Sequence, residues 1–384
     1  MKSQLTSRER VRLALNHQEP DRVPVVFGAD GNTTMVAEAY ETLKRHLGVE
    51  SQTRLYNRAF RYTVIDEAVM QHFHSDIRPL VGWASPRLAP VNGPHDTFTD
   101  VWQIGYRRSP GMIYYEMVVP PLRDARTPKD IAAYPWPKAE ALLDLSGLRE
   151  RARRLHDETN YAIQGWHQGT SSLFELSWYL RGLPEFLEDL AANPEMAHAI
   201  MRRMTDLAKE TAVLYLKEVG DYLDIFQMGD DLGMQSGPMI SLKMFREHVK
   251  PYMAEYYALL HELTPAKLLM HSCGGISAFL DDLIELGVDA INPVQVSAQG
   301  MDTVQLKKRF GKQLCFSGGI DTQHVLPYGS TQDVREEVQR RIRDLAPGGG
   351  YLLAAVHTIQ PDVPVENICA MYEAAQEYGA YPIA

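Results

Sequence analysis

A histidine and a cysteine two positions apart are the strongest candidates for chemistry in this sequence. They are His271 and Cys273, in the run His-Ser-Cys-Gly at the end of a short apolar stretch. In an extended chain, side chains two positions apart point to the same side, so this imidazole and this thiolate could bind one ion. The pairing suits zinc, which needs at least three protein ligands. The alternative is that Cys273 packs as a small hydrophobic residue and His271 is a hydrogen-bonded polar one.

His357 is the candidate third ligand. It ends the last apolar stretch of the chain, and closure of a barrel could bring it close to the other two. The remaining cysteines, Cys315 and Cys369, lie in a strand-like and a helix-like stretch, so we interpret both as packing residues. Three cysteines in a chain of 384 residues predict no disulfide framework.

Three aspartates are candidate catalytic carboxylates. Asp230 and Asp231 are adjacent, in the run Gly-Asp-Asp-Leu-Gly, so only one of them can point into a barrel mouth if the chain is still extended there. That residue could act as a general acid, bind the substrate or coordinate the metal. A helix N-cap or a loop turn is the open alternative for the pair. Asp76, which follows a His-Phe-His-Ser run, is the third candidate.

Polar and aromatic residues at the ends of other predicted strands are candidate substrate contacts. Trp166 and His167 are adjacent, and Asn32 follows the first predicted strand. Such a group could line a pocket for a flat substrate. The alternative for Trp166 is a place in the core, where aromatic side chains are also common.

The elements that must position these residues alternate between short apolar runs and longer amphipathic stretches, as expected for βα units around a parallel sheet. The predicted strands are 161–167, 223–230, 267–273, 288–294, 313–320 and 351–357, with 22–27 as the first strand and a further one reaching residue 80. Nearly all of them end in residues that can do chemistry, and barrel enzymes have their sites at that end of the strands. We therefore predict an α/β fold, a (β/α)8 TIM barrel, as a single domain over residues 1–384.

Two stretches depart from this alternation. Between about residues 82 and 137 the periodicity fails and prolines cluster, while 99–104 and 113–119 look like short antiparallel strands. We interpret this stretch as an inserted hairpin region over the barrel mouth. The helical stretch 183–219 contains Asn193 followed by Pro194, which predicts two helices in place of one.

Composition narrows the functional classes. The formal net charge is -10, without a basic block, which argues against binding to nucleic acid. The first residues lack the apolar core of a signal peptide, and no apolar run approaches the roughly 18 residues of a membrane span. We expect a cytoplasmic protein with no membrane association.

The motifs taken together resemble the uroporphyrinogen decarboxylase superfamily, which includes corrinoid-dependent methyltransferases. The resemblance spans nearly the whole chain. It rests on the segments 7–24, 180–195, 229–233, 238–252, 271–274, 317–323 and 346–351. It implies the same barrel fold and, at the family level, a homodimer.

Two branches of the superfamily compete. The decarboxylases need no cofactor and hold an acidic tetrapyrrole with an arginine-rich element near the first strand; here residues 28–33 contain no arginine, although the run ending in Asp76 is similar to their aspartate element. The methyltransferases bind zinc through a His-x-Cys pair and a later cysteine. In this sequence His271 and Cys273 match the pair, and His357 stands at the later position.

The resemblance to the second branch implies a zinc-assisted methyltransferase of the O- or N-demethylase type. It would pass a methyl group from a small substrate, for which we prefer a methoxylated aromatic, to a corrinoid. The corrinoid would be held by a partner protein, because this chain lacks the Asp-x-His-x-x-Gly corrinoid motif. Zinc, or an acid such as Asp230 or Asp231, would act on the substrate atom that loses the methyl group and so lower the barrier to the transfer. The alternatives are a cofactor-free decarboxylase or other lyase, and a barrel that binds a ligand without catalysis.

Overall fold

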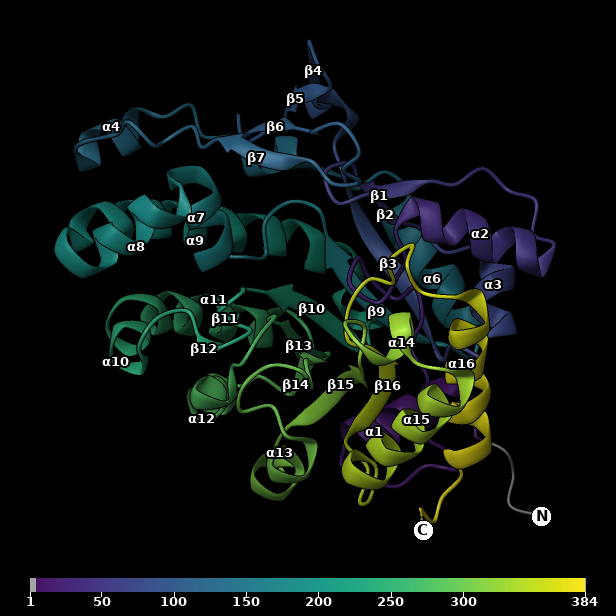
Figure 1. Cartoon of the computed structure of the whole chain (residues 1–384). Coiled ribbons are helices and arrows are strands. Elements are labelled where there is room, and N and C mark those ends of the chain that lie inside the picture. The colour runs from purple at the N-terminus through teal and green to yellow at the C-terminus, as the bar shows by residue number, and fades with distance from the viewer. Residues whose placement is uncertain (1–4, 384) are drawn as a thin grey trace.

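The strands predicted from the apolar runs form a parallel sheet in the computed structural model, which describes residues 5–383. Neighbouring strands pair in parallel from β3 to β16, and Figure 1 shows them at the centre of the molecule. They are β3 (Ile77–Ala84), β9 (Ala162–His167), β10 (Ile225–Gly229), β13 (Lys267–His271), β14 (Ala290–Val294), β15 (Cys315–Ile320) and β16 (Tyr351–Ala355). The predicted α/β barrel fold is confirmed.

The first predicted strand, 22–27, closes the barrel between β16 and β3 with an incomplete set of ladder bonds. Val26 N–H donates to the Leu353 carbonyl at 2.9 Å, and Asp76 N–H donates to the Val25 carbonyl at 2.8 Å. Pro24 has no N–H to donate, although its carbonyl accepts from Leu353 at 2.9 Å. The segment therefore forms one bridge to β16, between Val25 and Leu353, and a backbone bond to Asp76 just before β3, in place of a regular strand.

The amino end of the barrel is closed by helix α1 (Ser7–Leu15), whose N-terminus carries a capping box of Thr6 and Glu9. Its apolar face packs against inward-facing side chains of the strands. The buried cluster consists of Val11, Ala14, Leu15, Val26, Ala29, Ile77, Ala162, Ile225, Leu269, Ala290, Cys315, Leu352 and Ala354. Because apolar side chains fill this end, the polar chemistry is left to the carboxyl ends of the strands, which we call the mouth.

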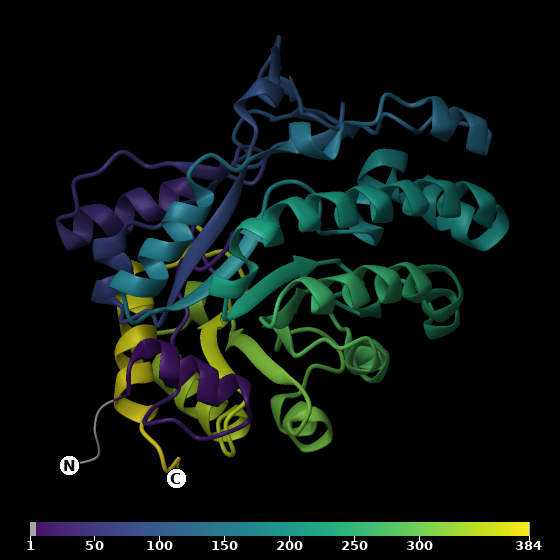
Figure 2. The same cartoon turned by 180° about the vertical axis from the view of Figure 1, so that it is seen from behind.

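Helices cover the outside of the barrel in both views (Figures 1 and 2). They include α6 (Leu148–Glu158), α7 (Phe174–Arg181), α8 (Leu183–Ala192), α9 (Pro194–Val219), α11 (Lys250–Leu263), α12 (Leu280–Glu285), α13 (Thr303–Phe310), α15 (Thr331–Leu345) and α16 (Val365–Tyr378). The predicted break between α8 and α9 falls at Asn193, as expected from the proline that follows it. Shorter or peripheral elements are α2 (Ala37–Leu47), α3 (Glu67–His72), α4 (Pro128–Ala133), α5 (Ala139–Leu142), α10 (Leu242–Met244), α14 (Val325–Tyr328), β8 (Leu143–Asp144), β11 (Gly233–Met234) and β12 (Gly237–Pro238).

The insertion after β3 is an antiparallel sheet of four short strands. They are β4 (Val91–Gly93), β5 (Thr97–Thr99), β6 (Gly105–Arg107) and β7 (Glu116–Val119), in that order. Figure 1 shows this sheet and α4 as an arm that runs above α7 and α8. The predicted strand 99–104 is wrong, because Asp100 accepts backbone N–H groups from Trp102 and Ile104 and so turns the chain between β5 and β6.

A small hairpin of β1 (Leu55–Asn57) and β2 (Tyr62–Thr63) lies beside the insertion. The Tyr115 N–H joins the two by donating to the Ala59 carbonyl at 3.0 Å. Within residues 5–383, no helix is both long enough and apolar enough to cross a lipid bilayer.

Candidate metal centre at the barrel mouth

His271, Cys273 and His357 converge at the mouth, although β13 and β16 are not neighbours in the sheet. Their nearest ligand atoms all lie within 4.8 Å of one another. His271 Nε2 is 3.5 Å from Cys273 Sγ, and the two imidazole centroids are 5.7 Å apart. Ligands of one tetrahedral zinc ion lie roughly 3.3–3.7 Å apart for ordinary bond lengths. The first pair already has this spacing. We call these three residues the ligand cluster.

A hydrogen bond fixes which nitrogen of His271 is free. Its Nδ1 lies 2.9 Å from Asn292 Oδ1, which can only accept, so Nδ1 carries the proton and Nε2 carries the lone pair. Asn292 is buried and donates in turn to Ser317 Oγ at 3.4 Å. Metal-bound histidines are commonly held in this way by an acceptor on the far nitrogen.

Burial controls the protonation of the other two members. It lowers the pKa of His357 to about 3, with a further contribution from neighbouring His271, so this imidazole is neutral at ordinary pH. Burial also raises the pKa of Cys273 well above its usual value, and the carboxylates of Asp231 and Glu175 raise it further. Without a cation the thiol keeps its proton, whereas a divalent ion would favour the thiolate.

The two adjacent aspartates have different surroundings. Asp231 Oδ1 accepts the Cys273 N–H at 2.8 Å and lies 3.8 Å from His271 Nε2, so this carboxylate reaches the ligand cluster. Asp230 instead accepts the backbone N–H groups of Leu173 and Glu175, at 2.9 and 2.7 Å, at the start of α7. Asp230 thus bonds the start of a helix from another strand, and Asp231 is the member of the pair whose carboxylate lies beside the ligand cluster.

Glu175 is a mouth carboxylate that sequence reasoning missed. Burial raises its pKa well above the usual value, and the nearby Asp231 and Asp230 raise it further, while hydrogen bonds from Ser172 and Tyr179 oppose the shift. It lies in the first turn of α7, where nothing in the sequence separates it from an ordinary exposed helical glutamate. The only available signal was its position shortly after the end of a strand.

Tyrosines from outside the barrel also reach the mouth. The Tyr62 ring lies 6.0 Å from the His357 ring, and the pKa of Tyr62 is raised by burial and then by neighbours that include Tyr114 and Cys273. The Tyr114 hydroxyl donates to Gln360, just beyond the last barrel strand. The β1–β2 hairpin and the insertion therefore cover one side of the ligand cluster.

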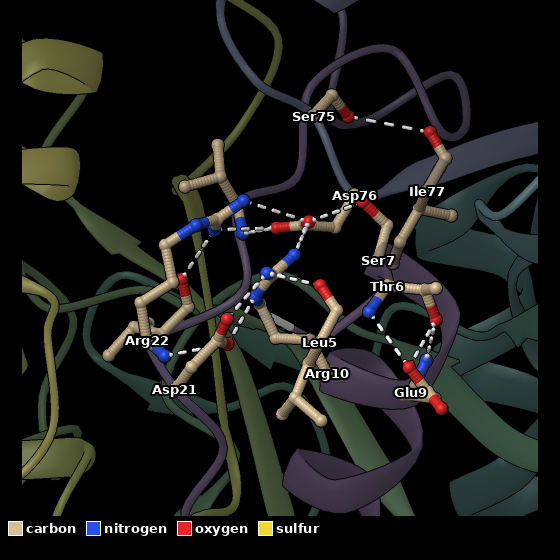
Figure 3. Close-up of polar contacts among 12 residues, drawn as sticks. Leu5, Thr6, Ser7, Glu9, Arg10, Asp21, Arg22, Ser75, Asp76 and Ile77 are labelled. Carbon is tan, nitrogen blue, oxygen red and sulfur yellow. Dashed lines mark hydrogen bonds and ion pairs between the residues drawn. The ribbon is translucent and has the colours of Figure 1, made fainter. Parts of the chain in front are cut away.

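Asp76 does not belong to this site, which corrects the role expected from its sequence context. It precedes the first residue of β3 and so lies at the amino end of the barrel, next to α1. It is fully buried and accepts from Arg10 at 2.7 Å, from Arg22 at 2.8 and 2.9 Å, and from Ser7 at 2.8 Å. Figure 3 shows the two guanidinium groups around this carboxylate. The group is a buried ion-pair network distant from the mouth.

His167 is also corrected as a substrate contact. In β9 its side chain alternates with that of Gln164, which faces the barrel interior, so the His167 ring packs outward between Tyr215 and Phe226, at 5.5 and 6.1 Å. Burial lowers its pKa to about 4. This imidazole belongs to the layer between the sheet and α9.

Trp166 and Asn32 remain near the barrel interior. Trp166 alternates to the inward face, on the same side as Gln164. Asn32 lies in the loop after the first strand, where its N–H donates to Asp30 Oδ1 at 2.7 Å. That loop meets the chain beyond His357, because the Thr358 hydroxyl donates to the Gly31 carbonyl at 3.0 Å.

Two surface hollows lie away from the mouth. One is lined by residues around the start of α6, and the other by residues of α3 and α16 that include Cys369. Neither contains a member of the ligand cluster or a carboxylate beside it.

Sequence comparisons identify related proteins. Residues 109–378 match the profile of the uroporphyrinogen decarboxylase (URO-D) family. A uroporphyrinogen decarboxylase of Chlorobaculum tepidum is 20% identical over 191 residues, 49% of this chain and 51% of the relative. The methylcobamide:CoM methyltransferase MtaA of Methanosarcina barkeri is 25% identical over 184 residues, 47% of this chain and 50% of the relative. The aligned region spans about half the length of these curated relatives.

Comparison with solved structures extends the likeness to nearly the whole chain. A methyltransferase from Methanosarcina mazei superposes with a TM-score of 0.64, covering 97% of this chain and 99% of that one, at 16% sequence identity. At this identity the likeness establishes the fold, and function has to be argued from the site.

Proposed function

The chain belongs to the uroporphyrinogen decarboxylase (URO-D) family, and we propose that it is a zinc-assisted methyltransferase of that family. It would move a methyl group from a small substrate, such as a methoxylated aromatic, to a corrinoid on a partner protein. The observation that carries this proposal is the convergence of His271, Cys273 and His357 within 4.8 Å. The methyltransferase from Methanosarcina barkeri, named for a methylated cobamide, supports the corrinoid part.

The donor set fits zinc in kind and in orientation. Two imidazoles and one thiol are ligands that zinc prefers, and His271 is held with Nε2 toward Cys273 by the bond to Asn292. His271, Cys273 and His357 would hold the ion. When bound, zinc would supply a Lewis acid that polarises the atom from which the methyl group departs.

Side chains at the mouth would donate a proton, position the thiol and exclude water. Burial and the carboxylates beside it raise the pKa of Glu175 and so favour its protonated form. This makes Glu175 the candidate proton donor to the oxygen or nitrogen that loses the methyl group. Asp231 accepts the Cys273 N–H and so holds the turn that carries the thiol. The tyrosines Tyr62 and Tyr114 would exclude water from one side.

A decarboxylase remains the competing activity within the family. Its name is that of the family profile and of the Chlorobaculum relative. Asp76 was the residue that motivated it, but this carboxylate is bound by Arg10 and Arg22 at the opposite end of the barrel. The ligand cluster has no role in a cofactor-free decarboxylation, so metal content distinguishes the two.

The decisive experiment is elemental analysis of the purified protein and of three variants, His271→Ala, Cys273→Ala and His357→Ala. We expect about one zinc per chain in the wild type and its loss in each variant. Matched controls are His46→Ala, which removes an exposed imidazole, and Cys369→Ser, which removes a thiol outside the mouth. A protein that binds no zinc after reconstitution would contradict the proposal. Methyl transfer is then assayed spectroscopically with cob(I)alamin and a methoxylated aromatic.

A further inference from the structure

Two buried hydrogen-bond donors near the mouth have no acceptor among residues 5–383. They are the hydroxyl of Tyr56 and the indole Nε1 of Trp166, and both atoms are shielded from solvent. The two rings meet edge to face with centroids 5.1 Å apart, and Tyr56 is only 7% exposed. A buried donor without an acceptor costs about 1–3 kcal/mol, so proteins seldom leave two side by side. The pair is ready to receive an acceptor from outside the protein.

The sheet register relates these donors to the ligand cluster. Gln164 of β9 pairs with Ile225 of β10, so Trp166 and Gln227, each two residues further along its strand, lie at the same level. Gln227 in turn pairs with Leu269 of β13. His271 lies two residues beyond Leu269 on the same inward face. Two residues of strand rise by roughly 6–7 Å. Because β10 lies between β9 and β13, two inter-strand spacings of about 4.8 Å add to this rise, and the backbones of Trp166 and His271 are roughly 12 Å apart. Both side chains point inward and cover part of this separation, and a ring with its substituents would bridge the rest.

The polar groups on this side of the barrel interior bond to one another and not to the two donors. Asp30 Oδ1 accepts the N–H groups of Asn32 and Thr33 at 2.7 and 2.8 Å, and its Oδ2 accepts from Gln164 at 2.6 Å. The same Gln164 amide donates to Gln227 Oε1 at 2.9 Å. Asp30 and Gln227 thus accept from groups other than Tyr56 and Trp166, which leaves these two donors for an acceptor on a ligand.

Charge narrows the class of ligand further. Burial raises the pKa of Tyr56 and Asp30, which is itself buried, raises it further, whereas Arg54, which lowers this pKa, is exposed on the surface. A ligand carboxylate here would meet a like charge in a poorly solvated environment. A quaternary ammonium ion would satisfy Asp30 but would leave both donors unpaired.

We propose that Tyr56 and Trp166 bind an uncharged oxygen, a hydroxyl, ether or carbonyl oxygen, on a flat one-ring substrate. The Trp83 ring, which stacks on Tyr56 at 5.3 Å, extends the aromatic surface for such a ring. The methyl group of the substrate then lies toward His271, Cys273 and His357. This orientation rests on the proposed methyltransferase function, whereas the acceptor-binding role of the two donors does not.

The test measures binding of three probes to the zinc-reconstituted wild type and to Tyr56→Phe by calorimetry. The probes are 2-methoxyphenol, which is neutral, 4-hydroxy-3-methoxybenzoate, which is anionic, and the tetramethylammonium ion. We expect the neutral phenol to bind most tightly and Tyr56→Phe to weaken its binding about 5- to 10-fold, the loss of one hydrogen bond. The free variant should be at least as stable as the wild type, because it loses an unpaired donor.

Tyr256→Phe is the matched control, since Tyr256 also has a buried hydroxyl without a partner but lies in α11, outside the barrel interior. It should bind the phenol as the wild type does. Equal affinity of Tyr56→Phe and wild type, tighter binding of the benzoate or the ammonium ion, or no binding of the phenol would overturn the inference. Zinc content is measured on the same samples, so failure of the metal proposal is seen separately.

Discussion

At the scale of single residues, the bond between His271 and Asn292 is the most informative contact of the site. We expect Asn292→Ala to weaken zinc binding about 10- to 100-fold, because the imidazole loses the acceptor that sets its tautomer and orientation. Asn292→Asp keeps an acceptor and should retain most of the affinity. Competition with a chelating dye measures both. An alanine variant that binds zinc as tightly as the wild type would show that the contact has no such role.

The protonated thiol of Cys273 leads to a second prediction. Burial and two nearby carboxylates raise the pKa of this thiol well above its usual value, so at neutral pH it carries a proton that zinc has to displace. We expect zinc binding near pH 7 to release about one proton per ion, measured by calorimetry in buffers of different ionisation enthalpy. The His46→Ala control should release the same amount. Zinc binding without proton release would contradict a thiolate ligand.

Sequence reasoning succeeded at residues whose chemistry follows from spacing alone. His271 and Cys273 are two apart, and the alternation of a strand brings them together whatever their surroundings. Sequence reasoning failed where one has to know which residues of a strand face the barrel interior. Trp166 and His167 were treated alike, although adjacent residues of β9 must face opposite sides. It also failed at Asp76, where the sequence did not reveal whether a strand ended or began.

At the scale of elements, helix α7 is held at its N-terminus by a carboxylate from another strand. Asp230 accepts two backbone N–H groups and the Ser172 hydroxyl there, yet burial raises its pKa to about 7. An unfolded aspartate titrates near about 3.9. The folded protein therefore binds this proton more tightly, and the contribution of Asp230 to stability is present below about pH 4 and is lost as the pH rises to about 7.

We expect this loss to reach up to about 4 kcal/mol of the free energy of unfolding. Asp230→Asn cannot titrate, so its stability should fall less than that of the wild type between about pH 4 and 7. Urea unfolding across this range measures the difference. Asp124→Asn, which changes an exposed carboxylate, should follow the wild type. Parallel pH profiles for wild type and Asp230→Asn would contradict the assignment.

The elements themselves were predictable to different degrees for physical reasons. Runs buried on both faces, such as β13 and β14, are continuous apolar stretches and stand out in the sequence. The first strand was also found, but Pro24 interrupts its ladder. The insertion was recognised by its lack of periodicity, whereas its strands were misplaced near Asp100, because strands of three or four residues carry too little pattern.

At the scale of the whole molecule, the candidate site lies at one end of the barrel and a structural ion-pair network at the other. The mouth gathers the ligand cluster, Asp231 and Glu175, while the amino end is sealed by α1 and by the ion pairs of Asp76. This division is general among such barrels, whose catalytic groups lie at the carboxyl ends of the strands. The resemblance to decarboxylases around Asp76 therefore concerns a segment that holds the first helix and the first strand to β3.

Replacement of Asp76 separates a structural role from a catalytic one. Asp76→Asn leaves the half-buried Arg22 without a carboxylate among residues 5–383 and leaves the buried Arg10 with Asp21 alone. Breaking a buried ion pair costs about 3–5 kcal/mol. We expect a large drop in the urea midpoint, while the protein that stays folded at low temperature retains zinc and binds 2-methoxyphenol as the wild type does. Asp124→Asn again serves as the control. A variant as stable as the wild type that had lost the enzymatic activity of the wild type would instead support a catalytic role for Asp76 and favour decarboxylation.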